Sequence, residues 1–255
     1  MKGALMAISE PFTSETSSPH SVIQDEVNHF NALADQWWDR KGPMSALHEI
    51  NSLRIEWIER IIKDFSWSDP SSQILDVGCG AGLVSEGLAK KGYHVLGIDA
   101  ASEVIRAAQA HLKQSPLYPG KGSLNYRIGN VEELLKEKQS FEIITALELI
   151  EHVHNPEQFI KNLADLLQPK GMIFISTLNR NIQSFLFAKV AAEYLTRKLP
   201  IGTHQWKKFI TPSELGFMAS KAGLRVAHIR GITWQPNGWK LDSNVKINYI
   251  ACLTN

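Results

Sequence analysis

Cysteine, long apolar runs and net charge are all scarce in this sequence. The 255 residues include two cysteines, Cys79 and Cys252, whose spacing matches no zinc site. No apolar run reaches the roughly 20 residues that a membrane-spanning helix requires. The formal net charge of +1 gives no reason to expect a nucleic-acid partner, and we expect none. The chain is therefore expected to work in a reducing, cytoplasmic compartment.

The composition divides the chain into three regions. Residues 1–20 are rich in Ser, Thr and Pro, which predicts a disordered tail. Residues 21–72 have apolar side chains at helical spacing on both sides of Gly42-Pro43. This pattern predicts an N-terminal extension of two helices, the second covering Leu47–Phe65. Residues 73–255 form the main domain, because strand and helix patterns alternate there to the end of the chain.

The main domain is predicted to have seven strands separated by helices. The strands are expected at Gln73–Val77, His94–Ile98, Leu124–Ile128, Phe141–Leu147, Met172–Thr177, Leu224–Ile232 and Lys246–Leu253. The helices are expected at Leu83–Lys91, Ser102–Gln114, Val131–Lys138, Pro156–Leu167, Ile182–Lys198 and Pro212–Ala222. Such alternation is typical of a mostly parallel α/β sheet covered on both faces. The turn-rich Gln235-Pro236-Asn237-Gly238 is too short for a helical crossover, so the last two strands are predicted to form an antiparallel hairpin.

A glycine-rich loop follows the first predicted strand, in Asp76-Val77-Gly78-Cys79-Gly80-Ala81-Gly82. Glycine permits a tight turn and a close approach of ligand to backbone, and the next helix offers free N–H groups to an anion. Asp99 ends the second predicted strand, where a carboxylate can accept hydrogen bonds from ribose hydroxyls. A dinucleotide fingerprint would need glycine at Leu83, so a nicotinamide cofactor is disfavoured. Loop and acid together resemble the S-adenosylmethionine site of the Rossmann-like class I methyltransferases.

The third predicted strand is followed by Asn130. Many class I methyltransferases have an acid at this position, which meets the adenine amino group. An amide oxygen can accept the same hydrogen bond, so Asn130 is a candidate cofactor-binding residue. The alternative is that Asn130 is the N-cap of the following helix.

Two carboxylates and an imidazole follow the fourth predicted strand, at Glu148, Glu151 and His152. Ligands of open α/β sheets bind outside the carboxyl ends of the strands, so these groups are expected close to the ligand. They could hold Mg²⁺ or another divalent cation that acidifies a bound hydroxyl. Alternatively, His152 could act as a general base, with Glu148 as a second catalytic residue. A third interpretation is that the three side chains only cap the loop and bond to one another.

Four segments outside the glycine loop are more specific. They are Phe30–Asp39, Leu47–Arg54, Ser176–Asn181 and Gly202–Ile210. With them the chain, from about Val22 to Leu253, resembles the ubiquinone-biosynthesis O-methyltransferase family. The resemblance implies S-adenosylmethionine as the methyl donor, bound by the domain at 73–255. It also implies methylation of catechol hydroxyls on polyprenylated ubiquinone precursors, at both O-methylation steps, and contact with other enzymes of that pathway.

The resemblance also implies which residues bind the cofactor. Arg54 looks like the residue that meets the methionine carboxylate, for which a guanidinium fork is suited. The alternative for Arg54 is a solvated position on its helix. Gly78, Gly80 and Asp99 match the loop and ribose positions, and Leu147 matches an apolar position on the adenine side.

Trp37 and Trp38 lie between the two predicted N-terminal helices. Adjacent tryptophans in such a segment are typical of aromatic packing between helices. The alternative is a lid over the substrate, because these helices must lie over the strand ends if Arg54 is to reach the cofactor.

The stretch at 180–211 is a predicted basic, amphipathic insertion. Its six basic residues face a single acid, Glu193, and are Arg180, Lys189, Arg197, Lys198, Lys207 and Lys208. A basic amphipathic helix can lie on an anionic membrane surface, which predicts peripheral contact with the inner face of the bacterial membrane through 180–208. The alternative is a helix that packs on the sheet and leaves its basic ends in solvent.

Two other classes of function remain open from the sequence. A C- or N-methyltransferase acting on a small molecule would share the glycine loop. A non-catalytic module that binds S-adenosylmethionine or lipid would keep Gly78 and Asp99 but would need no general base.

Overall fold

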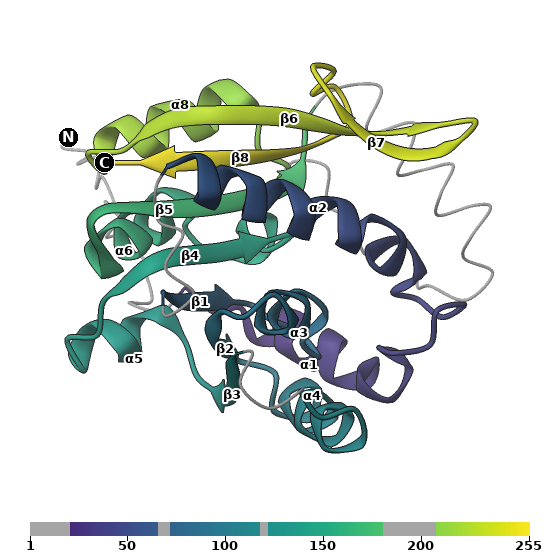
Figure 1. The fold of residues 1–255 in the computed structure, drawn as a ribbon. Helices are drawn as coiled ribbons and strands as arrows, with labels where there is room; N and C mark the ends of the chain where they lie inside the picture. The colour runs from purple at the N-terminus through teal and green to yellow at the C-terminus, as the bar shows by residue number, and fades with distance from the viewer. Residues whose placement is uncertain (1–20, 66–71, 118–121, 181–207) are drawn as a thin grey trace, which may run out of the picture.

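A computed structural model describes residues 21–65, 72–117, 122–180 and 208–255. The predicted tail at 1–20 and the predicted helix at Ile182–Lys198 lie outside the described residues. The described residues fold into one sheet with helices on both faces, shown in Figure 1.

Two helices precede the sheet, as predicted. They are α1 (Gln24–Ala32) and α2 (Ser45–Asp64), and a short 3-10 helix, η1 (Ala34–Gln36), lies between them. Helix α2 buries one side, including Ile58 and Ile62, because its apolar residues recur at helical spacing. Helix α1 has no buried residue. Its position against the main domain therefore depends on contacts made by individual side chains, at its ends and on the side that faces the pocket.

The described part of the main domain contains eight strands and the helices that connect them. The strands are β1 (Gln73–Val77), β2 (His94–Asp99), β3 (Ser123–Ile128), β4 (Phe141–Leu147), β5 (Leu167–Leu178), β6 (Arg225–Gln235), β7 (Gly238–Asp242) and β8 (Asn248–Thr254). The helices are α3 (Leu83–Lys90), α4 (Ser102–Gln114), α5 (Val131–Lys136), η2 (Ile150–His152), α6 (Pro156–Leu166) and α8 (Pro212–Lys221). All lie within five residues of the predicted bounds except η2 and β7, which were not predicted.

The strand order in the sheet is β3-β2-β1-β4-β5-β8-β6-β7. Strands β1 to β5 are parallel, while β8 pairs antiparallel with both β5 and β6. The chain builds outwards from β1 to β3 and then returns to start β4 on the other side of β1. Such a reversal opens a crevice at the carboxyl ends of the two central strands, where ligands of α/β sheets bind.

The predicted terminal hairpin is wrong in one respect. The turn at Gln235-Pro236-Asn237-Gly238 joins β6 to β7, with Trp234 opposite Trp239 and Gln235 opposite Gly238. Strand β8 follows and pairs with β6 on its other edge, so the sheet has eight strands rather than seven. Strand β7 was not predicted because it has only five residues and is flanked by turn signals. Its Trp239 and Leu241 nevertheless alternate with polar residues and pack beside α2.

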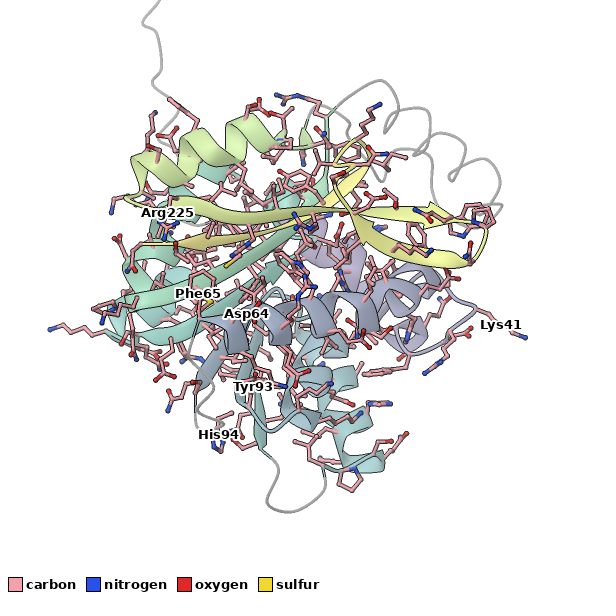
Figure 2. The ribbon with its side chains drawn as sticks, turned by 45° about the horizontal axis from the view of Figure 1, so that its top comes forward. Lys41, Asp64, Phe65, Tyr93, His94 and Arg225 are labelled. Carbon is pink, nitrogen blue, oxygen red and sulfur yellow. The ribbon has the colours of Figure 1, made fainter. Side chains whose placement is uncertain are left out.

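Both faces of the sheet are buried, which explains the nearly continuous apolar runs of the parallel strands. Neighbouring residues of β1 point to opposite faces: Leu75 packs with the core under α5, α6 and α8, and Ile74 with the core under α2 and α3. Figure 2 shows side chains filling the space between the sheet and these helices, with Asp64 and Phe65 at the end of α2. Within the described ranges, no helix is long and apolar enough to cross a membrane.

Candidate active site

The glycine loop turns sharply between β1 and α3. Gly78 and Gly80 have φ of 64° and 54°, in the left-handed region that favours glycine. A β-carbon on Gly80 would lie 2.3 Å from Cζ2 of Trp37, and one on Gly78 would lie 2.7 Å from Leu149. Both the left-handed backbone and the side chains packed against the loop therefore require glycine at these two positions.

Asp99, at the end of β2, holds this loop from the side. Its Oδ2 accepts a hydrogen bond from the Gly80 N–H at 3.0 Å, and its Oδ1 accepts one from the Ala101 N–H at 2.8 Å. Burial raises the pKa of Asp99, while these backbone bonds act against that rise. Each oxygen keeps a further lone pair, so the carboxylate can still accept hydrogen bonds from a ligand.

Asp76 is a buried acid below the loop that the sequence did not single out as a site residue. It is 2 % exposed, and it accepts hydrogen bonds from Ser85 Oγ at 2.5 Å and Thr145 Oγ1 at 2.6 Å. Burial raises its pKa against the effect of these two bonds. Asp76 thereby joins β1, α3 and β4 beneath the pocket, and it also lines the pocket wall.

Arg54 reaches the pocket from α2, although it is only 2 % exposed. Its Nη1 lies 3.8 Å from Glu148 Oε1, and its Nη2 donates to Asn51 Oδ1 at 3.3 Å. Its Nε has no hydrogen-bond partner among the described residues. Burial lowers the pKa of the guanidinium, and the charges of Glu148 and Asp76 oppose this. A buried cation with an unused donor is suited to receive an anionic ligand, so the solvated alternative for Arg54 is wrong.

Asn130 and Leu147 both line the same pocket. The Asn130 side chain accepts a hydrogen bond from the Glu133 N–H at 3.0 Å, which confirms that it is the N-cap of α5. An amide oxygen has two lone pairs, so this cap leaves one available to a ligand. The two interpretations of Asn130 are therefore compatible.

Glu148 follows β4 in an unusual backbone conformation. Its φ of 54° is left-handed, which is strained for a residue with a side chain. Ser176 Oγ donates to its carboxylate at 2.7 Å, and Asn248 Nδ2 lies 3.2 and 3.3 Å from its two oxygens. Strands β5 and β8 thus fix the carboxylate beside Arg54, as an acceptor in a network and not as a free group.

His152 ends η2 and is held by the N-terminal helix. Its Nδ1 lies 3.0 Å from Glu26 Oε2, and Lys208 Nζ lies 3.3 Å from the other oxygen of Glu26. The hydrogen bond with His152 lowers the pKa of Glu26 to about 2, against the effect of burial. Burial by itself would lower the pKa of His152, but the bond to Glu26 and the charges of Glu151 and Glu26 raise it overall.

The structure does not support the predicted metal site at Glu148, Glu151 and His152. Glu148 bonds to Ser176 and Asn248, and His152 bonds to Glu26 through Nδ1. These bonds alone leave lone pairs on the Glu148 carboxylate and on Nε2 of His152, so the decisive residue is Glu151. Glu151 is 6 % exposed and does not line the pocket, and burial followed by the charge of Glu148 raises its pKa to about 7. No group of three or more His, Cys, Asp or Glu side chains among the described residues is arranged to hold a metal ion.

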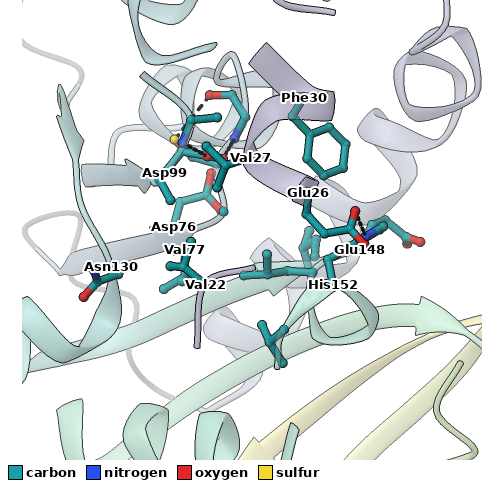
Figure 3. A pocket seen from close by; sticks show the side chains of 18 of the residues that line it. Val22, Glu26, Val27, Phe30, Asp76, Val77, Asp99, Asn130, Glu148 and His152 are labelled. Atoms are coloured by element: carbon teal, nitrogen blue, oxygen red, sulfur yellow. Dashed lines mark hydrogen bonds and ion pairs between the residues drawn. The ribbon is translucent and has the colours of Figure 1, made fainter. Parts of the chain in front are cut away.

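One pocket brings together the predicted site residues, with the exception of Glu151. It is lined by Arg54, Gly78, Gly80, Asp99, Asn130, Leu147, Glu148 and His152. Figure 3 shows Asp76 and Asp99 on one side of this pocket and Glu26, Glu148 and His152 on the other. The glycine loop and the charged cluster therefore face a shared space.

The chain ahead of β1 forms much of the remaining wall, which the sequence analysis largely missed. Apolar side chains of this segment line the pocket at Val22, Ile23, Val27, Phe30, Trp37, Met44 and Leu47. Their helical spacing predicted packing between helices, and a place over the substrate was considered only for Trp37 and Trp38. Trp37 does both, since it packs in a core with α4 and also lines the pocket. Trp38 instead donates a hydrogen bond from Nε1 to Ala81 O and stacks on His111.

Comparison with known proteins gives consistent similarities. A family model described as a methyltransferase domain matches residues 47–229. The chain is 42% identical over 241 residues to the ubiquinone biosynthesis O-methyltransferase of Coxiella burnetii strain CbuK_Q154, covering 94% of this chain and 99% of that protein. It is 39% identical over 240 residues to the protein of the same name from Pelagibacter ubique, covering 91% and 98%.

Solved structures show the same fold at lower identity. The magnesium protoporphyrin IX methyltransferase of Synechocystis PCC 6803, solved with bound S-adenosylhomocysteine, matches with a TM-score of 0.66 and 15% identity. The match covers 91% of this chain and 99% of that one. The predicted class I methyltransferase fold, mostly parallel with antiparallel C-terminal strands, is thereby confirmed.

Proposed function

The chain belongs to the ubiquinone biosynthesis O-methyltransferases, and from that premise we propose that it methylates a catechol hydroxyl of a polyprenylated ubiquinone precursor. The observation that carries this proposal is the pocket, where the predicted donor-binding residues and His152 line one cavity. We propose the same site for both O-methylation steps, because a single pocket can accept successive catechol-type substrates that share a tail.

We propose that S-adenosylmethionine binds along the glycine loop. Arg54 would receive its carboxylate, because this buried guanidinium has an unused Nε. Asp99 would accept the ribose hydroxyls, and the left-handed glycines Gly78 and Gly80 leave the backbone open to close approach. Asn130 and Leu147 would meet the adenine through the second lone pair of the amide and an apolar contact. When bound, the sulfonium supplies an electrophilic methyl group.

On the acceptor side, we assign the general base to His152. The imidazole would take the hydroxyl proton while the acceptor oxygen takes the methyl group, whose carbon–sulfur bond would break to give a neutral thioether. Proton transfer by a positioned side chain typically contributes about 10²–10⁴-fold in rate. Glu148 would orient Arg54 and the acceptor, because Ser176 and Asn248 hold its carboxylate in place.

The experiment that tests this proposal uses methyl-labelled S-adenosylmethionine and a short-chain catechol analogue. We expect label on oxygen, and we expect His152→Ala and Glu148→Ala to reduce turnover while the protein stays folded. Label on carbon or nitrogen would favour the alternative of a different small-molecule methyltransferase. Wild-type turnover in both variants would overturn the assignment of the base and its companion.

We also propose that residues 180–208 bring the enzyme to an anionic membrane surface, where a polyprenylated acceptor dissolves. Support comes from the six basic residues against one acid in this stretch. Co-flotation with vesicles containing anionic lipid should fall when Lys189, Arg197 and Lys198 are changed to Gln. The exposed Lys161 on α6 provides a control in Lys161→Gln. Equal flotation of all variants would overturn this part of the proposal.

A further inference from the structure

A contact between the N-terminal helix and the turn after β4 has no role in the function described so far. Glu26 lies on α1 and His152 ends η2, 126 positions later in the sequence. Glu26 Oε2 and His152 Nδ1 are 3.0 Å apart, and both side chains line the pocket. Their side chains are 23% and 16% exposed, so water competes little for this contact.

The chemistry of the two groups fixes where the ring proton resides. An ionised carboxylate can only accept hydrogen bonds, so Nδ1 of His152 must carry the hydrogen of this contact. In a neutral imidazole the other nitrogen, Nε2, then holds the lone pair. The described residues offer Nε2 no hydrogen-bond partner, so it remains available to a ligand.

Two further contacts limit how this pair can move. Lys208 Nζ lies 3.3 Å from Glu26 Oε1, so each oxygen of the carboxylate has its own partner. The Phe30 ring meets the His152 imidazole edge to face, with centroids 5.4 Å apart and an interplanar angle of 79°. Phe30 is one turn after Glu26 on α1, so a single helix face supplies both the acceptor for Nδ1 and a wall for the ring.

From this geometry we propose that Glu26 is a positioning residue for the reaction, which holds His152 in the Nδ1–H tautomer so that Nε2 can take the proton of the acceptor hydroxyl. The inference rests on the proposed function, in which His152 is the base. Helix α1 thereby contributes a polar group to the chemistry in addition to an apolar wall.

The alternative is that Glu26 only fastens α1 to the main domain. Other contacts already do this: Ser21 bonds to Glu132 through its N–H and hydroxyl, and Asn31 Oδ1 accepts from the Glu103 N–H. A purely structural role predicts loss of stability in a Glu26 variant with no change in the ring of His152. The test therefore needs a readout from the imidazole itself.

The test compares Glu26→Ala and Glu26→Gln with Asp25→Ala and Asp25→Asn. Asp25 is the exposed neighbour on the same helix, so its variants control for removing a negative charge from α1. Nitrogen-15 spectra of histidine-labelled protein, with His152 assigned through His152→Ala, report which ring nitrogen carries the proton at a pH where the ring is neutral. Steady-state kinetics then give kcat and both KM values for each variant.

We expect Nδ1 of His152 to be protonated in the wild type and in both Asp25 variants. In Glu26→Ala we expect the ring to shift towards the Nε2–H tautomer and kcat to fall about tenfold to hundredfold, as small misplacements of catalytic groups do. The KM for S-adenosylmethionine should stay nearly unchanged. Glu26→Gln should lose less, because an amide oxygen can accept the same bond. The neutral bond is weaker than a charge-assisted one, so a partial shift of the tautomer is still expected there, and its absence overturns the inference if the alanine variant does not fold.

The outcomes separate this inference from the proposed function. An unchanged tautomer in both Glu26 variants would overturn the inference, and so would a changed tautomer with wild-type kcat. The separate measurement on His152→Ala decides whether His152 is the base at all. Wild-type turnover in that variant would overturn the proposed base, whereas the spectra of the Glu26 variants would still report whether Glu26 sets the tautomer.

Discussion

The ring of Trp37 lies so close to Gly80 that a β-carbon on the glycine would be 2.3 Å from Trp37 Cζ2. Trp37, which lines the pocket from the N-terminal segment, therefore packs directly against the loop that precedes α3. Neither residue can change size without moving the other, because protein interiors are packed closely enough to feel a single added carbon.

Gly80→Ala should consequently be worse than the backbone alone would predict. A left-handed conformation costs an alanine roughly 1–2 kcal/mol, and an overpacked contact costs about 1–3 kcal/mol more. The matched control is Gly223→Ala, because Gly223 has φ of 77° with nothing within 4 Å of an added β-carbon. Denaturant unfolding should show a larger loss of stability for Gly80→Ala than for Gly223→Ala. Calorimetric titration with S-adenosylmethionine should show weaker binding for Gly80→Ala and unchanged binding for Gly223→Ala. Equal stability losses would mean that the Trp37 ring gives way freely.

Arg54→Lys should weaken binding of S-adenosylmethionine although it keeps the positive charge. Lysine lacks the planar fork, and a hydrogen bond to a charged group is worth about 1.5–3 kcal/mol. This corresponds to a rise in Kd of roughly tenfold to hundredfold, measurable by titration calorimetry. Arg60→Lys on the exposed side of α2 is the control, and its Kd should match the wild type. A normal Kd in Arg54→Lys would contradict the assigned role of the guanidinium.

Ser176→Ala should disturb Glu148 more than it disturbs the fold. The buried hydroxyl donates to the Glu148 carboxylate and accepts from the Glu148 N–H, which helps to hold that residue at φ of 54°. Losing a bond worth about 0.5–1.5 kcal/mol should reduce kcat roughly twofold to tenfold. Thr254→Val removes a buried hydroxyl that has no partner among the described residues, and it should leave kcat unchanged. Identical kinetics in the two variants would argue against Glu148 as an oriented group.

Docking of α1 should depend on pH through the pair Glu26 and His152. The pKa of Glu26 is lowered from 4.5 to about 2, chiefly by its bond with His152, so its stabilisation is present above pH 4.5 and lost as pH falls through about 2. Burial opposes the rise in the pKa of His152, but the bond to Glu26 and nearby charges raise it above 6.5. Its stabilisation is present below pH 6.5 and lost as pH rises through the raised pKa.

These two limits predict the strongest docking of α1 between about pH 4.5 and 6.5. Hydrogen exchange of the α1 amides, corrected for the intrinsic effect of pH on exchange, measures this directly. The Glu26→Gln variant should lose the dependence. A wild-type helix equally protected from pH 5 to pH 9 would show that the ion pair contributes nothing to docking.

The sequence predicted those features that depend on local patterns. Strand β1 and helix α4 were predicted to the residue, because an apolar run between a turn and the glycine loop, and an apolar stripe starting at Ser102, are strong signals. Strand β7 was missed because its five residues carry too short a pattern. Asn130 shows the limit of choosing between roles, since one side chain both caps α5 and lines the pocket.

Long-range pairings could not be predicted in the same way. The partner of His152 is 126 positions away on α1, and the partner of Glu148 is 100 positions away at the start of β8. Nothing in the spacing of Glu148, Glu151 and His152 reveals that Ser176, Asn248 and Glu26 engage two of them. The metal site was predicted because three ligating groups lie within five residues, and that spacing does not reveal that Glu151 fails to line the pocket with the other two.

The division of the pocket between two stretches of chain also matters for how such enzymes diversify. The glycine loop and Asp99 belong to consecutive strands of the sheet, whereas much of the wall facing them comes from residues 21–47, ahead of β1. Under the proposed function, substitutions in that leading segment are expected to alter which acceptors are admitted and to spare the donor site, provided that Trp37 stays packed against Gly80. An exchange of only the leading segment that keeps Trp37 is therefore expected to act on acceptor choice with the sheet unchanged.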